Sequence, residues 1–261
     1  MIPARLAANR LPGKPLLPIG GRPLIQWVWE CACASGAASI TIATDDERIR
    51  SAASSFGADA VLTAREHASG TDRIAEVVRA RDLGPDEIVV NLQGDEPLTP
   101  PAVLRRVATA LSERPSVDIA TVAAPILTLA EFLDPNCVKA LCARDGSALY
   151  FSRAPVPWPR EHVAAGLPTA YAGSLRHIGI YAYRARSLEL FAGWPPTPLE
   201  DAEKLEQLRA LEHGMRIHVV TLDEAPPAGV DTPEDLERVR AALRGANPAG
   251  LHGSSVRLTY R

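Results

Sequence analysis

The chain has few cysteines, no long apolar run and no excess of positive charge. It has four cysteines in 261 residues, and none of their spacings matches a zinc site. No apolar run approaches the roughly 20 residues that a bilayer-spanning helix needs. The formal net charge is -3, so no global basic field would attract duplex nucleic acid. These absences argue against a zinc-stapled module, a membrane-spanning protein and a nucleic-acid-binding protein.

A secretion signal is also missing. No signal peptide precedes Pro3, so we expect a cytoplasmic protein whose thiols stay reduced. All four cysteines are then expected to be buried structural residues. Hydrophobic residues make up 46% of the chain, which is enough to build the core of one large α/β domain or of two small ones.

What the sequence does contain is an alternation of strand-like and helical segments. Apolar runs predict strands at 40–44, 60–63 and 88–92. The run at 88–92 is apolar without alternation, which is typical of a parallel strand covered on both faces. Helical spacing of apolar residues predicts a helix before each later strand, with Asp45 or Asp46 and Thr71 as candidate caps. This order implies βαβ units and a parallel sheet.

Residues from about 118 to 183 follow a different pattern. Several strand-like runs with turn signals such as Asp145-Gly146 predict hairpins and an antiparallel or mixed insertion. A helix beginning at Thr232 and running to about Leu243 ends the periodic part of the chain. We therefore predict one α/β domain over residues 1–244, with a disordered tail over 245–261.

Three cations, Arg5, Arg10 and Lys14, lie in an N-terminal segment whose prolines and glycine disfavour a helix. A loop of this kind presents backbone N–H groups and fixed positive charge to a polyphosphate. It is not a P-loop, because no Ser or Thr follows Lys14. The alternative is that these cations are ordinary solvated surface.

Two acidic segments could hold a metal. The strand at 88–92 ends in Gln93-Gly94-Asp95-Glu96-Pro97, and ligands of open α/β sheets bind beyond the carboxyl ends of strands. Alternatively, Asp95 and Glu96 could simply start the next helix. In the second segment an ordinary helix start at Thr232 leaves Asp231 unexplained. If Asp95 and Asp231 converge, they form a dicarboxylate site for Mg²⁺, which prefers carboxylates plus phosphate oxygens.

Other polar residues permit two interpretations each. The segment 67–73, with Ser69 and Arg73, could read a base edge by hydrogen bonds or could be a plain helix cap. His177 and Tyr181 lie on one face of a predicted strand, where they could hold a polar ligand such as a sugar or belong to the core. Glu206 and Gln207 lie between core leucines and are expected to be exposed unless they bind a ligand.

Several long segments resemble the 3-deoxy-manno-octulosonate cytidylyltransferase family. They cover nearly all of residues 2–243 and read IPAR, RLPGKPL, ATDD, SGTDR, NLQGDEP, LYFSRAPVPW, RHIGIYAYR, PLEDAEKLEQLRAL and GVDTPEDLERV. The resemblance implies transfer of CMP from CTP to the eight-carbon acid sugar Kdo, with release of pyrophosphate, for lipopolysaccharide synthesis. It also implies a Rossmann-like nucleotide-diphospho-sugar transferase fold. In that fold a mixed, mostly parallel sheet carries the smaller insertion, which forms the sugar pocket and joins a homodimer.

The resemblance further implies a role for each site residue. Arg5, Arg10 and Lys14 would hold the triphosphate, with Arg10, Lys14 and Asp95 catalytic. Asp95 and Asp231 would bind Mg²⁺. Ser69 and Arg73 would lie near cytosine, and Gln93 would also bind substrate. Five residues would line the Kdo pocket: Arg153, His177, Tyr181, Glu206 and Gln207.

Two rival functions and two departures from the family pattern go with this resemblance. The rivals are a cytidylyltransferase for a related acid sugar, such as 8-amino-Kdo or a sialic acid, and a non-catalytic nucleotide-binding protein. Asp95 and Asp231 argue against the latter, because binding alone needs no metal pair. Family members carry more apolar residues before IPAR, so we expect a clipped first strand or a misassigned start codon. Ala68 also stands where the family often has Gln.

Overall fold

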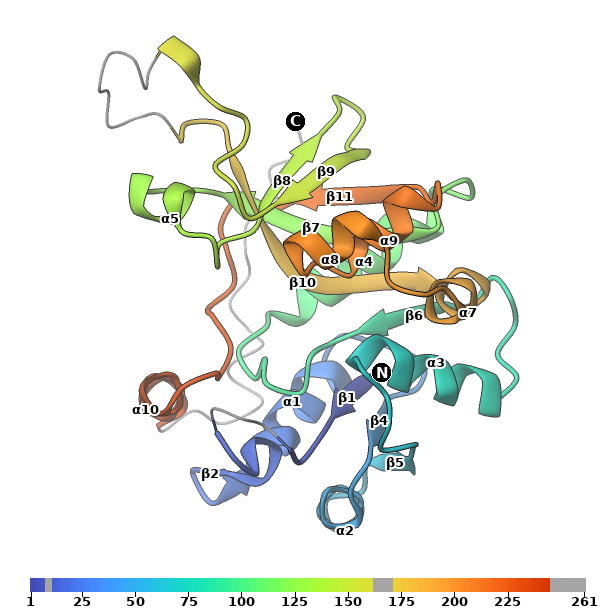
Figure 1. Cartoon of the computed structure of the whole chain (residues 1–261). Helices are drawn as coiled ribbons and strands as arrows, with labels where there is room; N and C mark the ends of the chain where they lie inside the picture. The colour runs from blue at the N-terminus through green and yellow to red at the C-terminus, as the bar shows by residue number, and fades with distance from the viewer. Residues whose placement is uncertain (8–10, 162–170, 245–261) are drawn as a thin grey trace. The chain divides into compact units, whose positions relative to one another are not determined.

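The computed structural model describes residues 1–7, 11–161 and 171–244, and these divide into two compact units. Unit 1 comprises residues 1–77, 92–105 and the segment from 226 onward. Unit 2 comprises residues 78–91 and 106–225, and so includes the expected insertion. Arg10 and the expected tail at 245–261 lie outside the described residues. Figure 1 shows the elements of both units.

Unit 1 is built on a three-stranded parallel sheet in the order β1-β4-β5. Its strands are β1 (Ile2–Ala4), β4 (Thr41–Thr44) and β5 (Asp59–Leu62). As expected, β1 is short, but all three of its residues are buried and pair with β4. The Leu92 N–H also donates to the Met1 carbonyl at 3.1 Å. These contacts anchor the start of the chain inside unit 1.

Helix caps set the ends of the helices in unit 1. Helix α1 spans Leu24–Cys33, and α2 (Glu47–Ser55) is capped by Asp46, whose carboxylate accepts from the Arg48 N–H. The expected cap at Thr71 is wrong, because α3 (Gly70–Ala80) begins one residue earlier. Ser69 is the cap instead: its hydroxyl accepts from the Asp72 N–H at 3.1 Å, and Asp72 accepts from the Ser69 N–H. Serine and threonine are both good N-cap residues, so residue type alone did not show which of them begins α3.

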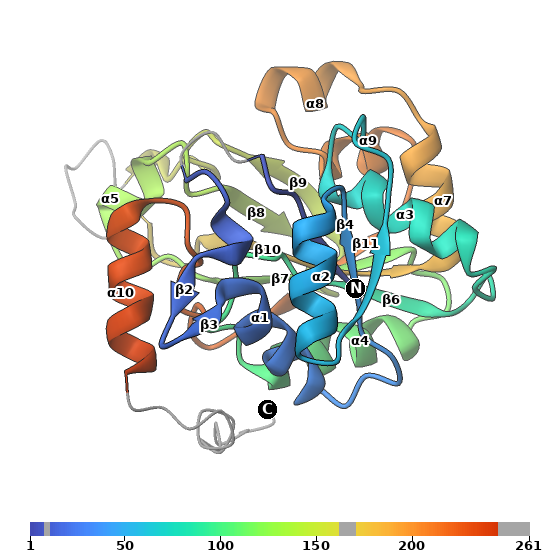
Figure 2. The ribbon, with the colours of Figure 1, turned by 90° about the horizontal axis from the view of Figure 1, so that it is seen from below.

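Helix α10 (Pro233–Leu243) begins as expected at Thr232, which forms a capping box with Asp235. Figure 2 shows α10 beside α1 and the two-stranded ribbon of β2 (Pro18–Ile19) and β3 (Arg22–Pro23). A buried apolar cluster joins these elements: Ile19, Leu24, Trp27, Val230, Leu236, Val239 and Leu243. This cluster holds the loop before α10 against the N-terminal segment, which contains the 3₁₀ turn η1 (Lys14–Leu16).

Unit 2 is built on a mixed sheet in the order β11-β7-β10-β8-β9, with β6 also paired to β10. The strands are β6 (Ile88–Asn91), β7 (Ile119–Pro125), β8 (Lys139–Cys142), β9 (Ala148–Ser152), β10 (Leu175–Arg184) and β11 (Ile217–Thr221). Strand β7 is parallel to β11, whereas β10 is antiparallel to β6, β7 and β8. The expectation of parallel pairing for β6 is wrong at this edge, because β10 returns from the insertion in the opposite direction.

The last two helices of unit 2, α8 and α9, flank the predicted site residue Glu206, and α9 begins with the predicted site residue Gln207. The helices are α4 (Pro101–Ser112, shared with unit 1), α5 (Leu129–Leu133), α7 (Ala185–Gly193), α8 (Pro198–Glu203) and α9 (Gln207–Glu212). The Arg209 guanidinium donates to both carboxylate oxygens of Glu200 at 2.7 and 2.6 Å, and both residues are buried. This fork-to-fork pair fixes α9 against α8.

Two sequence expectations concern cysteines and membranes. Cys31 and Cys137 are buried, but Cys33 is exposed and Cys142 is half-buried, so the expectation of four buried thiols is wrong. Cys33 ends α1 on its outer side, where the helix needs no apolar residue. Within the described residues, no helix combines the length and the apolarity that crossing a membrane requires.

We predict that Glu200→Gln lowers the free energy of unfolding by about 3 kcal/mol, because it removes the negative charge that two nitrogens of the buried Arg209 guanidinium contact. The matched control is Glu189→Gln, an exposed change on α7 that should cost less than about 0.5 kcal/mol. Urea denaturation of the two variants measures the difference. Equal stabilities would show that the pair contributes nothing to the junction of α8 and α9.

Candidate active site

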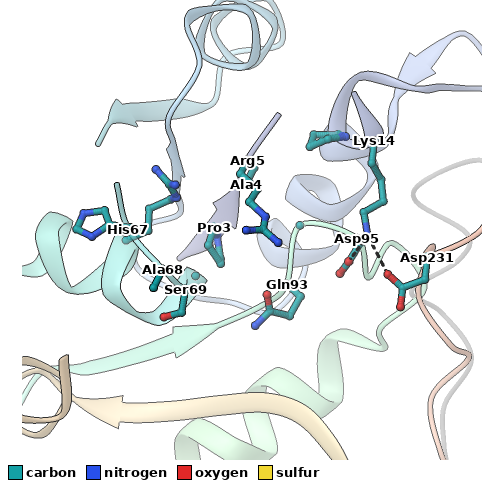
Figure 3. A pocket seen from close by; sticks show the side chains of 14 residues that line it. Pro3, Ala4, Arg5, Lys14, His67, Ala68, Ser69, Gln93, Asp95 and Asp231 are labelled. Carbon is teal, nitrogen blue, oxygen red and sulfur yellow. Dashed lines mark hydrogen bonds and ion pairs between the residues drawn. The ribbon is translucent and has the colours of Figure 1, made fainter. Parts of the chain in front are cut away.

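A pocket of about 290 Å³ opens on unit 1 and is lined mainly by predicted site residues (Figure 3). Its walls come from β1, the η1 turn, the loop before α3, the loop after β6 and the loop before α10. The lining residues are Pro3, Ala4, Arg5, Lys14, Pro15, His67, Ala68, Ser69, Gly70, Arg73, Gln93, Gly94, Asp95 and Asp231. The segments predicted for the triphosphate, the cytosine and the metal therefore meet in one cavity.

Close backbone packing around Pro3 shapes the floor of this pocket. A Cβ atom on Gly94 would lie 2.7 Å from the Pro3 carbonyl oxygen, and one on Gly70 would lie 3.1 Å from the Pro3 ring. Neither position can hold a side chain without a shift, so glycine allows both loops to approach β1. Arg5, which follows β1 directly, is exposed and projects into the pocket (Figure 3).

The Lys14 ammonium joins the two predicted metal ligands. It donates to Asp95 Oδ2 at 2.6 Å, to Asp231 Oδ1 at 3.1 Å and to the Val230 carbonyl at 2.8 Å. Burial by itself would lower the pKa of Lys14, but the attraction of Asp95 and Asp231 outweighs burial and raises that pKa. Lys14 therefore carries a positive charge and neutralises part of the charge on the carboxylates.

Gly229 determines how closely the loop before α10 approaches Asp95. A Cβ atom there would lie 2.8 Å from the Asp95 carbonyl oxygen and 2.9 Å from Glu96 Oε1. Because Gly229 has no Cβ atom, the Val230 N–H can donate a hydrogen bond to the Asp95 carbonyl at 2.9 Å. Asp231, the next residue, is thereby brought beside Asp95.

Glu96 is close enough to Asp95 and Asp231 to interact with their charges, and the sequence indicated for it only a possible helix start. Burial, then the neighbouring Asp95 and Asp231, raises the pKa of Glu96 to about 7. The alternative that Asp95 and Glu96 start the next helix is wrong, because α4 begins only at Pro101. Both acids are therefore free of a capping role and belong to the loop that faces the pocket.

Ser69 and Arg73 line the pocket but also have structural partners. The guanidinium of Arg73 is buried and donates to Thr63 Oγ1, to the Ala64 carbonyl at 3.1 Å and to Asp45 Oδ2 at 3.2 Å. Burial is also the main cause that lowers the pKa of Arg73. Ser69 caps α3. Their predicted contacts with cytosine stay predictions, as do those of the half-buried Gln93.

The donor set at Asp95 and Asp231 suits a divalent cation of the magnesium type. Both carboxylates already converge on one cationic centre, the Lys14 ammonium. Among the residues that the structure describes, no cluster of three or more His, Cys, Asp or Glu side chains could hold a metal. Two carboxylates completed by phosphate oxygens and water are what Mg²⁺ usually accepts. The residues therefore fit a cation that is shared with a phosphate ligand.

The five residues predicted for the sugar all lie in unit 2. His177 Nε2 lies 2.9 Å from Thr121 Oγ1, and its ring contacts those of Phe151 and Tyr181. Burial lowers the pKa of His177 to about 3, so its imidazole is neutral. Burial first, then Tyr183 and Glu206, raises the pKa of Tyr181 well above its usual value. His177, Tyr181 and Glu206 are thus brought together.

Arg153 is attached to the junction of α8 and α9. Its guanidinium donates to the carbonyls of Glu203 at 2.6 Å and Pro135 at 2.9 Å, while its own N–H donates to the Glu203 carboxylate. Gln207 is buried rather than exposed, and its amide nitrogen has no hydrogen-bond partner within the described residues. The expectation that Gln207 is exposed is therefore wrong, and the predicted contacts of Arg153 and Gln207 with the sugar stay predictions.

Three functional candidates escaped sequence reasoning. Asn91 is completely buried, faces Tyr181 across the β6–β10 pairing, and has no partner for either amide atom in the described part of the chain. Glu203 and Thr121 hold Arg153 and His177 respectively. The position of Asn91, a polar residue at the end of an apolar strand, is the sequence signal that could have identified it.

Comparisons with known proteins agree with this geometry. The family model described as "Cytidylyltransferase" matches residues 1–217. A 3-deoxy-manno-octulosonate cytidylyltransferase of Pseudomonas syringae pv. syringae is 54% identical over 247 residues, covering 94% of this chain and 97% of that protein. The enzyme of the same name from Vibrio cholerae serotype O1 is 53% identical over 240 residues, with 92% and 95% covered. The chain belongs to the 3-deoxy-manno-octulosonate cytidylyltransferase family.

Solved structures of cytidylyltransferases and related enzymes share the fold. A CMP:2-keto-3-deoxy-manno-octonic acid synthetase complexed with CTP superposes with a TM-score of 0.85 at 41% identity, covering 94% of this chain and 97% of that one. A putative glucose-1-phosphate thymidylyltransferase from Bacillus anthracis gives 0.63 at 17% identity over 94% and 95% of the chains, which supports the fold alone. The expected nucleotide-diphospho-sugar transferase fold is confirmed, and the chain is a nucleotidyltransferase.

We predict that Gly229→Ala lowers the free energy of unfolding by about 1–3 kcal/mol, because the added methyl group overlaps the Asp95 carbonyl. Gly193→Ala is the matched control, since its Cβ would meet no atom within 4 Å and its φ is not positive. It should leave stability unchanged or raise it slightly. Thermal unfolding compares the two, and equal melting temperatures would contradict the close approach at Gly229.

Proposed function

We propose that the chain transfers CMP from CTP to the anomeric 2-hydroxyl of Kdo and releases pyrophosphate, for lipopolysaccharide synthesis. The observation that carries the proposal is the convergence of Lys14, Asp95 and Asp231 in the pocket of unit 1. A non-catalytic nucleotide-binding protein would need no such pair of carboxylates. Relatives over 50% identical along nearly the whole chain carry the name of this activity.

The pocket supplies positive charge for the triphosphate. Arg5 projects into it, and Lys14 reaches it from the η1 turn. Arg10, which belongs to the same predicted loop, would add a third cation. Phosphate oxygens accept charge-assisted hydrogen bonds from such groups, and these bonds strengthen as negative charge develops during the reaction.

The reaction is an in-line displacement at the α-phosphorus. The Kdo oxygen forms a bond to phosphorus as the bond from phosphorus to the α–β bridging oxygen breaks, so pyrophosphate leaves and the hydroxyl proton passes to water. Asp95 and Asp231 would hold Mg²⁺, which when bound lowers the pKa of a hydroxyl and neutralises charge on phosphate oxygens. Lys14 and Arg5 would stabilise the charge that develops on the leaving pyrophosphate.

Unit 2 offers polar groups suited to an acid sugar. The Arg153 guanidinium donates to carbonyl oxygens rather than to a carboxylate in its described contacts, so its charge is available to the sugar carboxylate. The buried amides of Asn91 and Gln207 lack partners among the described residues, and such groups are costly unless a ligand or water satisfies them. His177, Tyr181 and Glu206 complete a hydroxyl-binding set.

We also propose that the chain works in the cytoplasm, where CTP is made, and as a homodimer. Four large apolar side chains between residues 127 and 158 are exposed: Leu127, Leu133, Leu149 and Trp158. Apolar side chains gathered on one segment are typical of a protein–protein contact. The expected insertion, which contains this segment, would therefore join the two copies.

Asp95→Asn should lower the turnover number by about two to three orders of magnitude, because it removes one of two charged ligands for the cation that neutralises the phosphates. Metal-free CTP binding should persist, since Arg5 and Lys14 remain. Pyrophosphate release and equilibrium nucleotide binding measure the two quantities. Asp223→Asn, an exposed carboxylate, is the control, and near-normal turnover of Asp95→Asn would refute the assignment.

The substrate is tested by pyrophosphate release with CTP and a panel of acid sugars. Kdo should give the highest kcat/KM, well above 8-amino-Kdo and sialic acid. A higher kcat/KM for 8-amino-Kdo would show that 8-amino-Kdo, not Kdo, is the preferred substrate, because one or two pocket contacts can decide between close analogues. Release with none of the sugars would refute the proposed activity.

The dimer is tested by the mass in solution. Light scattering should give twice the mass of the chain, and Leu133→Glu on α5 should shift the protein toward the monomer. Leu190→Glu on α7 is the matched control, because Leu190 is exposed to a similar extent (57% against 53%) but lies outside the insertion. A monomeric wild-type protein, or equal effects of the two changes, would refute this interface.

A further inference from the structure

Lys14 occupies the place between the two carboxylates that a cation would take. Its ammonium group has three N–H donors, and they face three acceptors: Asp95 Oδ2, Asp231 Oδ1 and the Val230 carbonyl. Figure 3 shows the side chain reaching from the η1 turn to both carboxylates. The hydrogen-bonding capacity of this ammonium is therefore fully used within the acidic loops.

A divalent cation and this ammonium group compete for the same oxygens. Magnesium needs carboxylate oxygens at about 2.0–2.1 Å, and the ammonium already lies 2.6 Å from Asp95 Oδ2 and 3.1 Å from Asp231 Oδ1. Two positive centres cannot share the space between one pair of carboxylates, because each repels the other at short range. The ammonium must leave before a cation can bind both acids.

A triphosphate offers the Lys14 ammonium alternative hydrogen-bond acceptors. Lys14 lines the same pocket as Arg5, so phosphate oxygens in this pocket would compete with the carboxylates for its hydrogen bonds. The backbone of Lys14 is held by the η1 turn and by a hydrogen bond to the Leu11 carbonyl at 3.1 Å. Only its flexible four-carbon stem needs to move.

We infer that Lys14 blocks the dicarboxylate site until a triphosphate draws its ammonium away, so that the divalent cation enters with the nucleotide rather than before it. This rests on the proposed function, because it takes Asp95 and Asp231 as cation ligands. The consequence is reciprocal: the nucleotide raises the affinity for the cation, and the cation raises the affinity for the nucleotide by the same factor. A free dicarboxylate pair would instead bind a cation alone.

Mn²⁺ binding without nucleotide tests the inference and needs no turnover. Electron paramagnetic resonance of free Mn²⁺ compares the wild type with Lys14→Met, which keeps the length of the stem and removes the charge. We expect Lys14→Met to bind Mn²⁺ at least about tenfold more tightly than the wild type. Lys14→Arg, which keeps a cation beside the acids, should bind as weakly as the wild type. Lys14→Met with Asp231→Asn should lose the gain, which assigns the bound ion to this site.

The outcomes separate the inference from the proposed function. If the wild type binds Mn²⁺ in the presence of CTP but Lys14→Met alone binds it no more tightly, Lys14 does not block the site and the inference is wrong. If no form binds Mn²⁺ even with CTP, the metal assignment and the inference both fail. Lys14→Gln is measured in parallel, and thermal unfolding confirms that each variant is folded before its affinity is compared.

Discussion

The contact of the Lys14 ammonium with the loops after β6 and before α10 organises unit 1. It joins residues that are 81 and 217 positions apart in the chain. The floor of the pocket depends on close backbone packing. Gly70 and Gly94 both approach Pro3 at places where a side chain would be too close. The pocket is thus made by loops that come close through missing side chains and are held by one shared cation.

Much of the fold could be predicted because local signals agree with it. The apolar run at 88–92, the Thr232 cap and the turn signal at Asp145-Gly146 each gave an element that the structure contains. Strand direction was harder to predict, because the partners of the β6 residues lie 90 to 96 positions later in the chain and no local pattern encodes that pairing. The cap of α3 was misplaced by two residues because Ser69 and Thr71 are equally suitable chemically.

The site was predictable where a residue had no structural explanation. Asp231 stood before a helix that Thr232 already caps, and the structure places it beside Asp95. Arg73 shows the opposite case, because its buried contacts with Thr63 and Asp45 would give it a structural role even without a ligand. Side-chain burial depends on partners far away in sequence, so Gln207 gave no local signal that its amide nitrogen is buried without a partner among the described residues.

Charge balance at the acidic loops of unit 1 bears on the proposed role of a divalent cation. Asp95, Glu96 and Asp231 lie together, and burial with the adjacent carboxylates raises the pKa of Glu96 to about 7. Protonation of Glu96 is therefore easier than protonation of an ordinary glutamate. Within the described part of the chain, the Asp95 and Asp231 carboxylates both form an ion pair with Lys14. If Lys14 turns to the phosphates as we infer, the Asp95 and Asp231 carboxylates would repel the triphosphate, and under the proposed function a cation between these carboxylates and the phosphates would remove that repulsion.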